Sequence, residues 1–344
     1  MTTPPAKQRE IHLAARPIGT PKPSDFRVAT TPVPEPADGQ FLVRNIYMSV
    51  DPYMRGRMRD VKSYVPPFQI GAVLDGGSAG QVVASRHPKF AEGDFVVGGQ
   101  GFREYYVSDG AGQRKVDPKV APLSAFLGIL GGPGLTAYVG LIDLGKPKAG
   151  ETLLVSAAAG AVGMVVGQIG KILGLRVVGS AGGPDKTRWL KEELGFDDAF
   201  DYRAAGGALD RAIAERCPDG VDIYFENVGG AMLEAALANM RPFGRIPLCG
   251  MIALYNDEQP QPGPRNLIFC IPRRLTLTGF IISDHFDRFP AFTRDVAGWL
   301  ADGKLKNRET IVQGIENAPA AFIGLLGGEN VGKMLVQIGP DPTR

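Results

Sequence analysis

The segment TLLVSAAAGAVGMVVGQIGKILG, residues 152–174, decides the fold. A β-prone apolar run ends at Ser156, a turn of small residues follows, and a helix-forming stretch begins. This arrangement is a variant of the glycine fingerprint of dinucleotide-binding domains, with alanine in place of the first glycine. Gly160 lets the backbone approach a pyrophosphate, and Gly163 lets the helix pack closely against the strand. The segment predicts a nucleotide site at a helix N-terminus, where backbone amides bind phosphate.

The pattern outside this segment changes twice along the chain. Residues 1–125 hold short β-like runs separated by Gly and Pro, which favour a β-rich barrel or sandwich domain. From 126 to 310, strand-like and helix-like segments alternate, as in a doubly wound parallel sheet. One of these helices begins at Pro184 and ends at Gly195. Residues 311–344 hold a helix, ENAPAAFIGLLGGEN, and a final strand, GKMLVQIGPD. We therefore predict an α/β chain of two domains, with the tail as a third segment.

The end of the second predicted strand favours NADP over NAD. NAD sites place an acidic residue about 20 positions after the first glycines, and that count from Gly160 reaches Ser180. Residues 174–184 contain no Asp or Glu. Cations that are available for a 2′-phosphate follow shortly afterwards: Lys186, Arg188 and Arg203.

Two later strand ends face the same edge of the predicted sheet. Asn227 follows the strand VDIYFENV, and Cys249 follows GRIPLCG. Ligands of open α/β sheets bind outside such carboxyl ends. Glu226 at a strand end is a possible catalytic acid, but a structural hydrogen bond is the better interpretation.

Composition excludes several other classes of protein. The 344 residues hold 38 Lys and Arg against 36 Asp and Glu, which gives no reason to expect nucleic acid or an anionic membrane as a partner. The N-terminus lacks the apolar region of a signal peptide. Two uncharged runs, residues 121–142 and 152–170, are interrupted by glycines, so we expect no membrane span. Three cysteines without CxxC spacing favour a reducing cytoplasm.

The residues do not suit a metal enzyme. A zinc dehydrogenase needs thiolate and imidazole ligands. The chain has three histidines, His12, His87 and His285, and no cysteine in its first 200 residues. We therefore expect no catalytic metal.

Motifs in one order along nearly the whole chain resemble the zinc-independent medium-chain reductases of the leukotriene B4 12-hydroxydehydrogenase and prostaglandin reductase type. The motifs are MSVDPYMRGRM, GGPGLTAYVGL, AAAGAVGMVVGQIGK, YFENVGG, CGMIALYN and GKMLV. DVKSYVPPFQIG is especially similar to bacterial curcumin reductases. The chain differs in Phe102, where many members have tryptophan, and in Glu226, which replaces a frequent aspartate.

The resemblance implies a GroES-like N-terminal domain and a Rossmann domain that binds NADPH. It implies reduction of the C=C bond of α,β-unsaturated aldehydes or ketones, an oxidoreductase reaction on CH–CH groups without zinc. It also implies a cytoplasmic homodimer with a small-molecule substrate. The apolar, β-prone residues 275–282 would form an internal strand or extend a sheet across an oligomer interface.

The same resemblance implies roles for individual residues. The pyrophosphate cradle would consist of Gly160, Ala161, Val162 and Gly163. The 2′-phosphate side would be formed by Lys186 and Tyr202, with Ser180 nearby. Along the cofactor would lie Asn227, Cys249 and Tyr255, with Asn330 at the nicotinamide end. Tyr53 and Tyr64 would line the substrate pocket.

Conjugate reduction needs a donor for the negative charge that develops on the carbonyl oxygen as hydride reaches the β-carbon. Tyr255 is the best candidate, because its hydroxyl stays protonated at neutral pH. The α-carbon then takes a proton from Tyr255 or from water. Two alternatives remain open: an NADPH quinone reductase of the same fold, and a non-catalytic NADPH-binding sensor.

Overall fold

The computed structural model describes residues 4–343, which form two compact units. Unit 1 contains the residues up to Leu127 and those from Glu309 on, and unit 2 contains Gly128–Arg308. The chain therefore completes unit 1 with its last residues. The predicted changes of segment at 125/126 and 310/311 each lie two residues from these divisions.

Unit 2 is built on a sheet in which all six strands run parallel. The strands are β8 (Thr152–Val155), β9 (Arg176–Ala181), β10 (Asp198–Asp201), β11 (Val221–Phe225), β12 (Met240–Leu248) and β13 (Thr276–Gly279). Their order across the sheet is β10-β9-β8-β11-β12-β13, and it reverses between β8 and β11. This is the order of a doubly wound dinucleotide-binding domain. The α/β prediction with a Rossmann-type sheet is confirmed.

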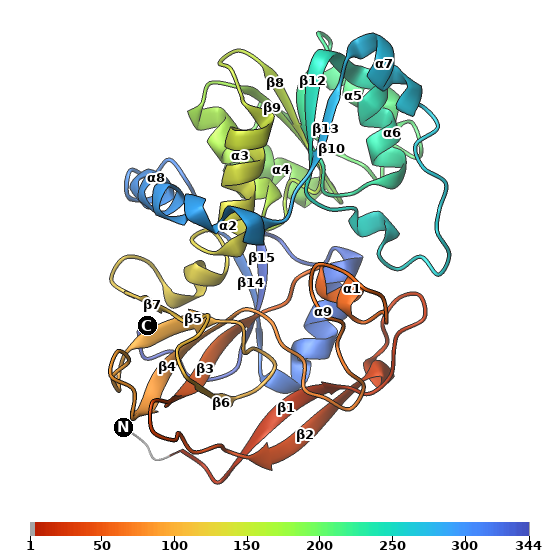
Figure 1. Cartoon of the computed structure of the whole chain (residues 1–344). Helices are drawn as coiled ribbons and strands as arrows, with labels where there is room; N and C mark the ends of the chain where they lie inside the picture. The colour runs from red at the N-terminus through yellow and green to blue at the C-terminus, as the bar shows by residue number, and fades with distance from the viewer. Residues whose placement is uncertain (1–3, 344) are drawn as a thin grey trace. The chain divides into compact units, whose positions relative to one another are not determined.

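Helices cover both faces of this sheet, as Figure 1 shows for α3 on one side and α5 with α6 on the other. Alternate residues along each strand point to opposite faces of the sheet and contact the helices on that face. Leu153 and Val177 lie against α3 at Gly170, while Leu154 and Val178 share a buried cluster with α5 and α6. Strands that are buried on both faces read as continuous apolar runs. The helices of unit 2 are α2 (Gly132–Tyr138), α3 (Gly163–Ile172), α4 (Pro184–Glu192), α5 (Leu209–Arg216), α6 (Gly230–Asn239), α7 (Cys270–Arg273) and α8 (Phe289–Ala301).

A π-helical segment, Val139–Gly145, continues α2. Side chains of this segment and of α2 form hydrogen bonds with residues in and directly before α8. Arg288 donates two hydrogen bonds to Asp143, at 2.8 and 2.9 Å, and the Tyr138 hydroxyl donates to Asp295 at 2.7 Å.

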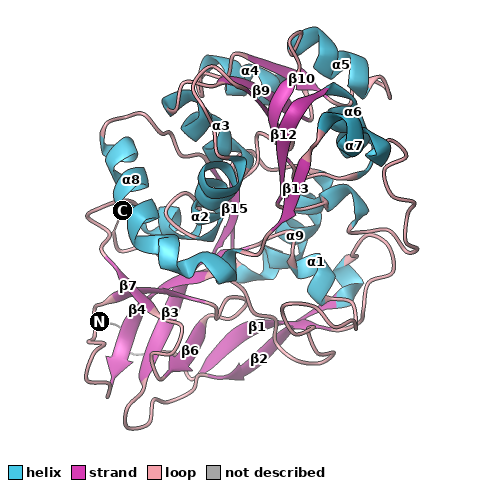
Figure 2. Cartoon of the chain, turned by 45° about the horizontal axis from the view of Figure 1, so that its top comes forward, coloured by secondary structure: helices cyan, strands magenta, loops and turns pink. Residues whose placement is uncertain are grey.

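Unit 1 is rich in strands, as Figure 2 shows. A separate antiparallel pair contains β1 (Lys7–Leu13) and β2 (Phe26–Pro32). The larger sheet contains β3 (Phe41–Ser49), β4 (Ser78–Ser85), β5 (Phe95–Gly98), β6 (Tyr105–Ser108), β7 (Arg114–Val116), β14 (Glu309–Gln313) and β15 (Lys333–Gln337). Among its described residues, unit 1 has the α-helices α1 (Met54–Arg57) and α9 (Ala318–Gly327).

Strand β3 is central to the larger sheet, because it pairs with β4, β6 and β15. Its partner β15 comes from the end of the chain, so the tail is part of the unit 1 sheet. A buried cluster on this unit joins residues of β1, β3, α1 and α9. The prediction of a β-rich N-terminal region is confirmed. Within residues 4–343, no helix combines the length and the apolar character that crossing a bilayer requires.

Candidate functional site: a dinucleotide site in unit 2

The turn between β8 and α3 forms a tight backbone cradle. Ala157 adopts a left-handed conformation with φ of 48°, and its carbonyl accepts the Gly160 N–H at 2.9 Å. A Cβ atom on Gly163 would lie only 2.4 Å from the same carbonyl oxygen, so glycine is required there. Ala161 and Val162 lie between the two glycines. The turn therefore exposes small residues and backbone groups at the N-terminus of a ten-residue helix.

Glu226 is fully buried and joins the ends of the neighbouring strands β8 and β11. Its Oε1 atom accepts hydrogen bonds from the Ser156 hydroxyl at 3.1 Å, from the Gly229 N–H at 3.0 Å and from the Val228 N–H. Asn227 in turn donates from Nδ2 to the Ser156 carbonyl at 2.8 Å. Burial raises the pKa of Glu226, although its hydrogen-bond donors oppose that shift. These bonds agree with a structural role for Glu226, and they hold Asn227 where the strand order reverses.

The end of β9 brings the predicted 2′-phosphate residues together. The Ser180 hydroxyl is buried, and it has no hydrogen-bond partner among residues 4–343. Lys186 is half-buried on α4. The Arg203 guanidinium lies 5.7 Å from the centre of the Tyr202 ring, and both side chains pack over Gly182, where a Cβ atom would be 3.1 Å from each.

Lys186 and Arg203 lie close enough to repel each other, whereas Arg188 forms an ion pair with an acidic residue. Burial and the nearby Arg203 guanidinium lower the pKa of Lys186. Two positive charges are therefore held close together at this strand end, an arrangement that a bound anion would relieve. Arg188 is exposed and pairs with Asp185 at 3.1 Å instead.

The segment after β12 places Cys249 close to the Glu226 backbone and the Tyr255 hydroxyl close to Gly250 and Met251. The Cys249 N–H donates to the Glu226 carbonyl at 2.9 Å. The Tyr255 hydroxyl accepts the Met251 N–H at 3.3 Å and lies 3.0 Å from the position of a Cβ atom on Gly250. Burial and the Glu226 carboxyl raise the pKa of Cys249 to about 12, so its side chain is a neutral thiol.

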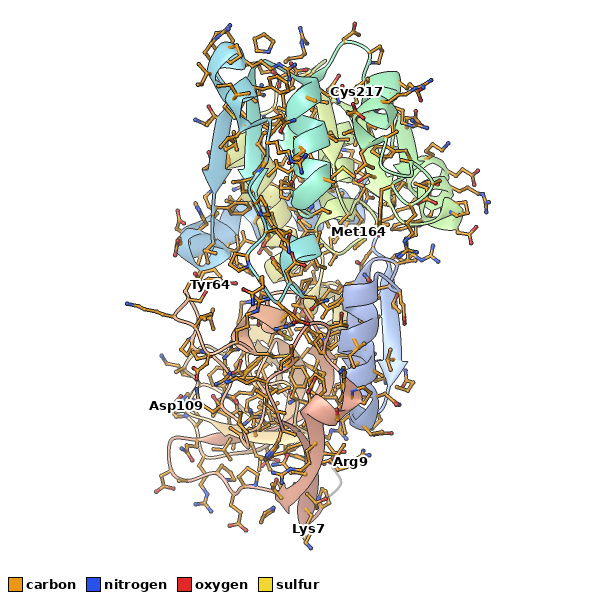
Figure 3. The ribbon with its side chains drawn as sticks, turned by 90° about the vertical axis from the view of Figure 1, so that its right-hand side faces the viewer. Lys7, Arg9, Tyr64, Asp109, Met164 and Cys217 are labelled. Atoms are coloured by element: carbon orange, nitrogen blue, oxygen red, sulfur yellow. The ribbon has the colours of Figure 1, made fainter. Side chains whose placement is uncertain are left out.

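The remaining predicted residues belong to unit 1. Tyr53 begins α1, and Tyr64 is exposed on the following loop, where Figure 3 labels it. Burial and the Asp51 carboxylate raise the pKa of Tyr53, and Tyr64 adds to this shift. Asn330 is buried, and its Nδ2 atom donates to the Gly332 carbonyl at 2.7 Å.

The structure thus collects the predicted cofactor residues of unit 2 at the carboxyl edge of one sheet, and it collects Tyr53 with Tyr64 in unit 1. Ser156 was not among the predicted site residues, although its hydroxyl donates to Glu226 and accepts the Asn227 N–H, and its carbonyl accepts from the Asn227 side chain. Its position as the first residue after β8 was the available signal, because the residue there borders the neighbouring strand end.

No group of three or more His, Cys, Asp or Glu side chains within residues 4–343 is arranged to hold a metal ion.

Two family models match the chain. Residues 9–116 match the N-terminal domain of oxidoreductases, and residues 161–298 match a model described as zinc-binding dehydrogenase. The first match lies in unit 1 and the second in unit 2.

Three similar proteins cover almost the whole chain. A putative NADP-dependent oxidoreductase of Bacillus subtilis is 50% identical, over 98% of this chain and 99% of its own length. The NADPH-dependent curcumin reductase of Escherichia coli is 46% identical, over 97% and 98%. The crystal structure of CurA from Vibrio vulnificus in complex with NADPH is 46% identical and has a TM-score of 0.92, over 97% of this chain and 100% of CurA.

Proposed function

This chain belongs to the zinc-independent medium-chain reductases of the prostaglandin reductase type, and we propose that it reduces the C=C bond of α,β-unsaturated ketones and aldehydes with NADPH. Relatives of this branch are named for their reactions as curcumin, 2-alkenal, pulegone and prostaglandin reductases. The observation that supports NADPH most directly is the pair of cations, Lys186 and Arg203, at the end of β9.

The residues of unit 2 fit this cofactor. The cradle leaves no room for a side chain at Gly163, and backbone groups at the start of α3 suit a pyrophosphate. The buried Ser180 hydroxyl lacks a protein partner among the described residues. A 2′-phosphate would accept from that hydroxyl and from the two cations.

We assign the following binding roles to individual residues. Gly160, Ala161 and Val162 would hold the pyrophosphate, and Lys186 with Tyr202 would hold the 2′-phosphate side. Asn227, Cys249 and Tyr255 would lie along the cofactor. Asn330 would contact the nicotinamide end, and Tyr53 with Tyr64 would line the substrate pocket. Bound NADPH supplies the hydride for the β-carbon.

Tyr255 would stabilise the negative charge that develops on the substrate carbonyl oxygen. Its hydroxyl accepts the Met251 N–H, and a hydroxyl that accepts one hydrogen bond can still donate another. The bond to Met251 also orients the phenol relative to the end of β12.

The first test is NADPH oxidation by the purified, chelator-treated protein, with an enal, an arylalkyl enone and a quinone assayed in parallel and repeated with NADH. We expect saturated carbonyl products and a preference for NADPH. Turnover of the quinone alone would replace this proposal with a quinone reductase. Tight NADPH binding without any turnover would replace it with a sensor.

Replacing Tyr255 with phenylalanine is expected to lower kcat/KM for the enone by about 10- to 100-fold, since loss of one oxyanion donor costs up to about 10³-fold in other enzymes. The dissociation constant of NADPH should stay within about threefold, because the ring is retained. Steady-state kinetics and fluorescence titration measure the two effects. Tyr105→Phe on β6 is the matched control and should behave as wild type; unchanged kcat/KM in Tyr255→Phe would exclude Tyr255 from the reaction.

We also propose that the protein is a homodimer formed along β13, the edge strand of the unit 2 sheet. Leu267, Ile268 and Ile271 precede this strand and are exposed, at 49%, 61% and 72%. An edge strand next to exposed apolar side chains favours pairing with a second copy. Sedimentation equilibrium should give twice the mass of one chain, and Ile271→Glu should shift it toward one. Ile18→Glu, at an exposed site in unit 1, should leave the mass unchanged; a monomeric wild type would refute the dimer.

A cytoplasmic location completes the proposal. It is supported by three unpaired cysteines, Cys217, Cys249 and Cys270, since oxidising compartments favour disulfides.

A further inference from the structure

A buried lysine of unit 1 joins two turns that are distant in the sequence. Lys333 is 1% exposed, and its Nζ atom donates to the Val50 carbonyl and to Asp51 Oδ1, both at 2.9 Å. Strands β15 and β3 run antiparallel with Leu335 opposite Ser49. Continuing this register by two residues, which means backward from Leu335 and forward from Ser49, places Lys333 opposite Asp51. The ion pair therefore extends the contact between the strands beyond the paired backbone.

On one side, Asp51 fixes the turn that leads into α1. Its Oδ2 atom accepts the Ser49 hydroxyl, and its backbone carbonyl accepts the Met54 N–H at 3.1 Å. Tyr53 lies inside this turn, and its carbonyl accepts the Gly56 N–H at 3.1 Å. The backbone position of Tyr53 thus depends on Asp51, which Lys333 holds.

On the other side, Lys333 directly follows the turn that contains Asn330. The Asn330 side chain spans this turn through its bond to the Gly332 carbonyl, and Gly332 has φ of 71°. Thr310 holds the middle of the turn, because its hydroxyl accepts the Val331 N–H at 3.0 Å and donates to the Val331 carbonyl at 2.9 Å.

Packing does not explain a lysine at this position. Burying an ammonium group costs a large desolvation free energy, which partners offset only when the geometry is good. An unbranched apolar side chain such as methionine would fill a similar volume without that cost. The charge instead provides a directional link between two turns, which an apolar contact does not.

We propose that Lys333 is a positioning residue for the reduction, which holds the turn of Tyr53 and the turn of Asn330 in a fixed relation through Asp51 and Val50. This inference rests on the proposed function, in which Tyr53 borders the substrate and Asn330 contacts the nicotinamide end. Small displacements of positioning groups lower the rate of reaction more than they weaken binding.

The test is the double variant Lys333→Met/Asp51→Asn, which removes both charges and leaves no buried charge unpaired. We expect the folded variant to lose at least about tenfold in kcat for an enone, because misplacement by about 1 Å costs up to about 10²-fold. The NADPH dissociation constant should stay within about threefold, since most cofactor residues lie in unit 2. Hydrogen–deuterium exchange should be at least about tenfold faster in residues 50–56 and 330–333, and unchanged in the β3–β4 pair.

The matched control is Lys115→Met/Asp94→Asn, which removes the ion pair between Lys115 of β7 and Asp94, the residue directly before β5, in the same unit. It should change neither the exchange of the two turns nor kcat. Unchanged exchange in Lys333→Met/Asp51→Asn would overturn the inference, and so would a kcat within twofold of wild type for the folded protein. If the wild type reduces no enone, the proposed function fails, and the exchange measurement alone decides whether Lys333 holds the two turns.

Discussion

Replacing Lys186 and Arg203 together with alanine is expected to raise the KM for NADPH by about 100-fold or more, with the KM for NADH nearly unchanged. The two cations lie together at the end of β9, where burial and mutual repulsion lower the pKa of Lys186. A hydrogen bond to a charged group contributes about 1.5–3 kcal/mol, and each 1.4 kcal/mol is a factor of about ten. Two lost bonds therefore predict the stated change, which steady-state kinetics with both cofactors would measure.

Arg188→Ala is the matched control for this prediction. Arg188 is on the same helix, α4, but its guanidinium is exposed and paired with Asp185. Its KM for NADPH should stay within about twofold of wild type. An unchanged KM for NADPH in the double variant would show that the 2′-phosphate binds elsewhere.

Gly163→Ala is expected to lower both the thermal stability and the affinity for NADPH. Its Cβ atom would lie 2.4 Å from the Ala157 carbonyl oxygen, so the backbone of the cradle must move. Overpacking of this kind costs about 1–3 kcal/mol, which corresponds to a fall in Tm of several degrees. We expect the dissociation constant of NADPH to rise by about 100-fold, as measured by fluorescence titration.

Alanine variants of two other glycines test the affinity for NADPH and the thermal stability separately. At Gly160 a Cβ atom would be 3.2 Å from the Ala157 carbonyl oxygen, so Gly160→Ala should fold normally and bind NADPH at least about tenfold more weakly. At Gly167 a Cβ atom would meet the Phe196 ring at 1.9 Å, so Gly167→Ala should lose stability but keep its affinity when folded. Wild-type affinity in Gly160→Ala would mean that the pyrophosphate does not bind in this cradle.

Local sequence signals were sufficient for most of unit 2. The run RVVGSA, with two adjacent valines, forms β9, the second strand of the predicted α/β alternation. The predicted helix from Pro184 ends just before Gly195, which has φ of 71°. By contrast, ETIVQ forms β14 in the unit 1 sheet. Its partner β15 begins 20 residues after the end of this short strand, so its own residues did not show to which unit it belongs.

The site could be predicted only where a short stretch of sequence carried the chemical signal by itself. Residues 174–184 contain no Asp or Glu, and this absence at the end of β9 indicated NADP from the sequence alone. The bonds of Glu226 to Ser156 depend instead on β8 and β11 being neighbours, which follows from the strand order and not from either segment. Likewise, Asp51 and Lys333 are 282 residues apart, and only the pairing of β3 with β15 brings them together.

The three cysteines have a further consequence for an enzyme that handles soft electrophiles. Burial raises the pKa of Cys217, at the end of α5 and labelled in Figure 3, to about 11; the pKa of Cys249 is about 12, and that of Cys270 is also raised. Enals and enones alkylate the thiolate form, and at pH 7 a pKa of 11 leaves about one thiol in ten thousand ionised. These cysteines are therefore poor targets for alkylation by the enals and enones that the protein is proposed to reduce.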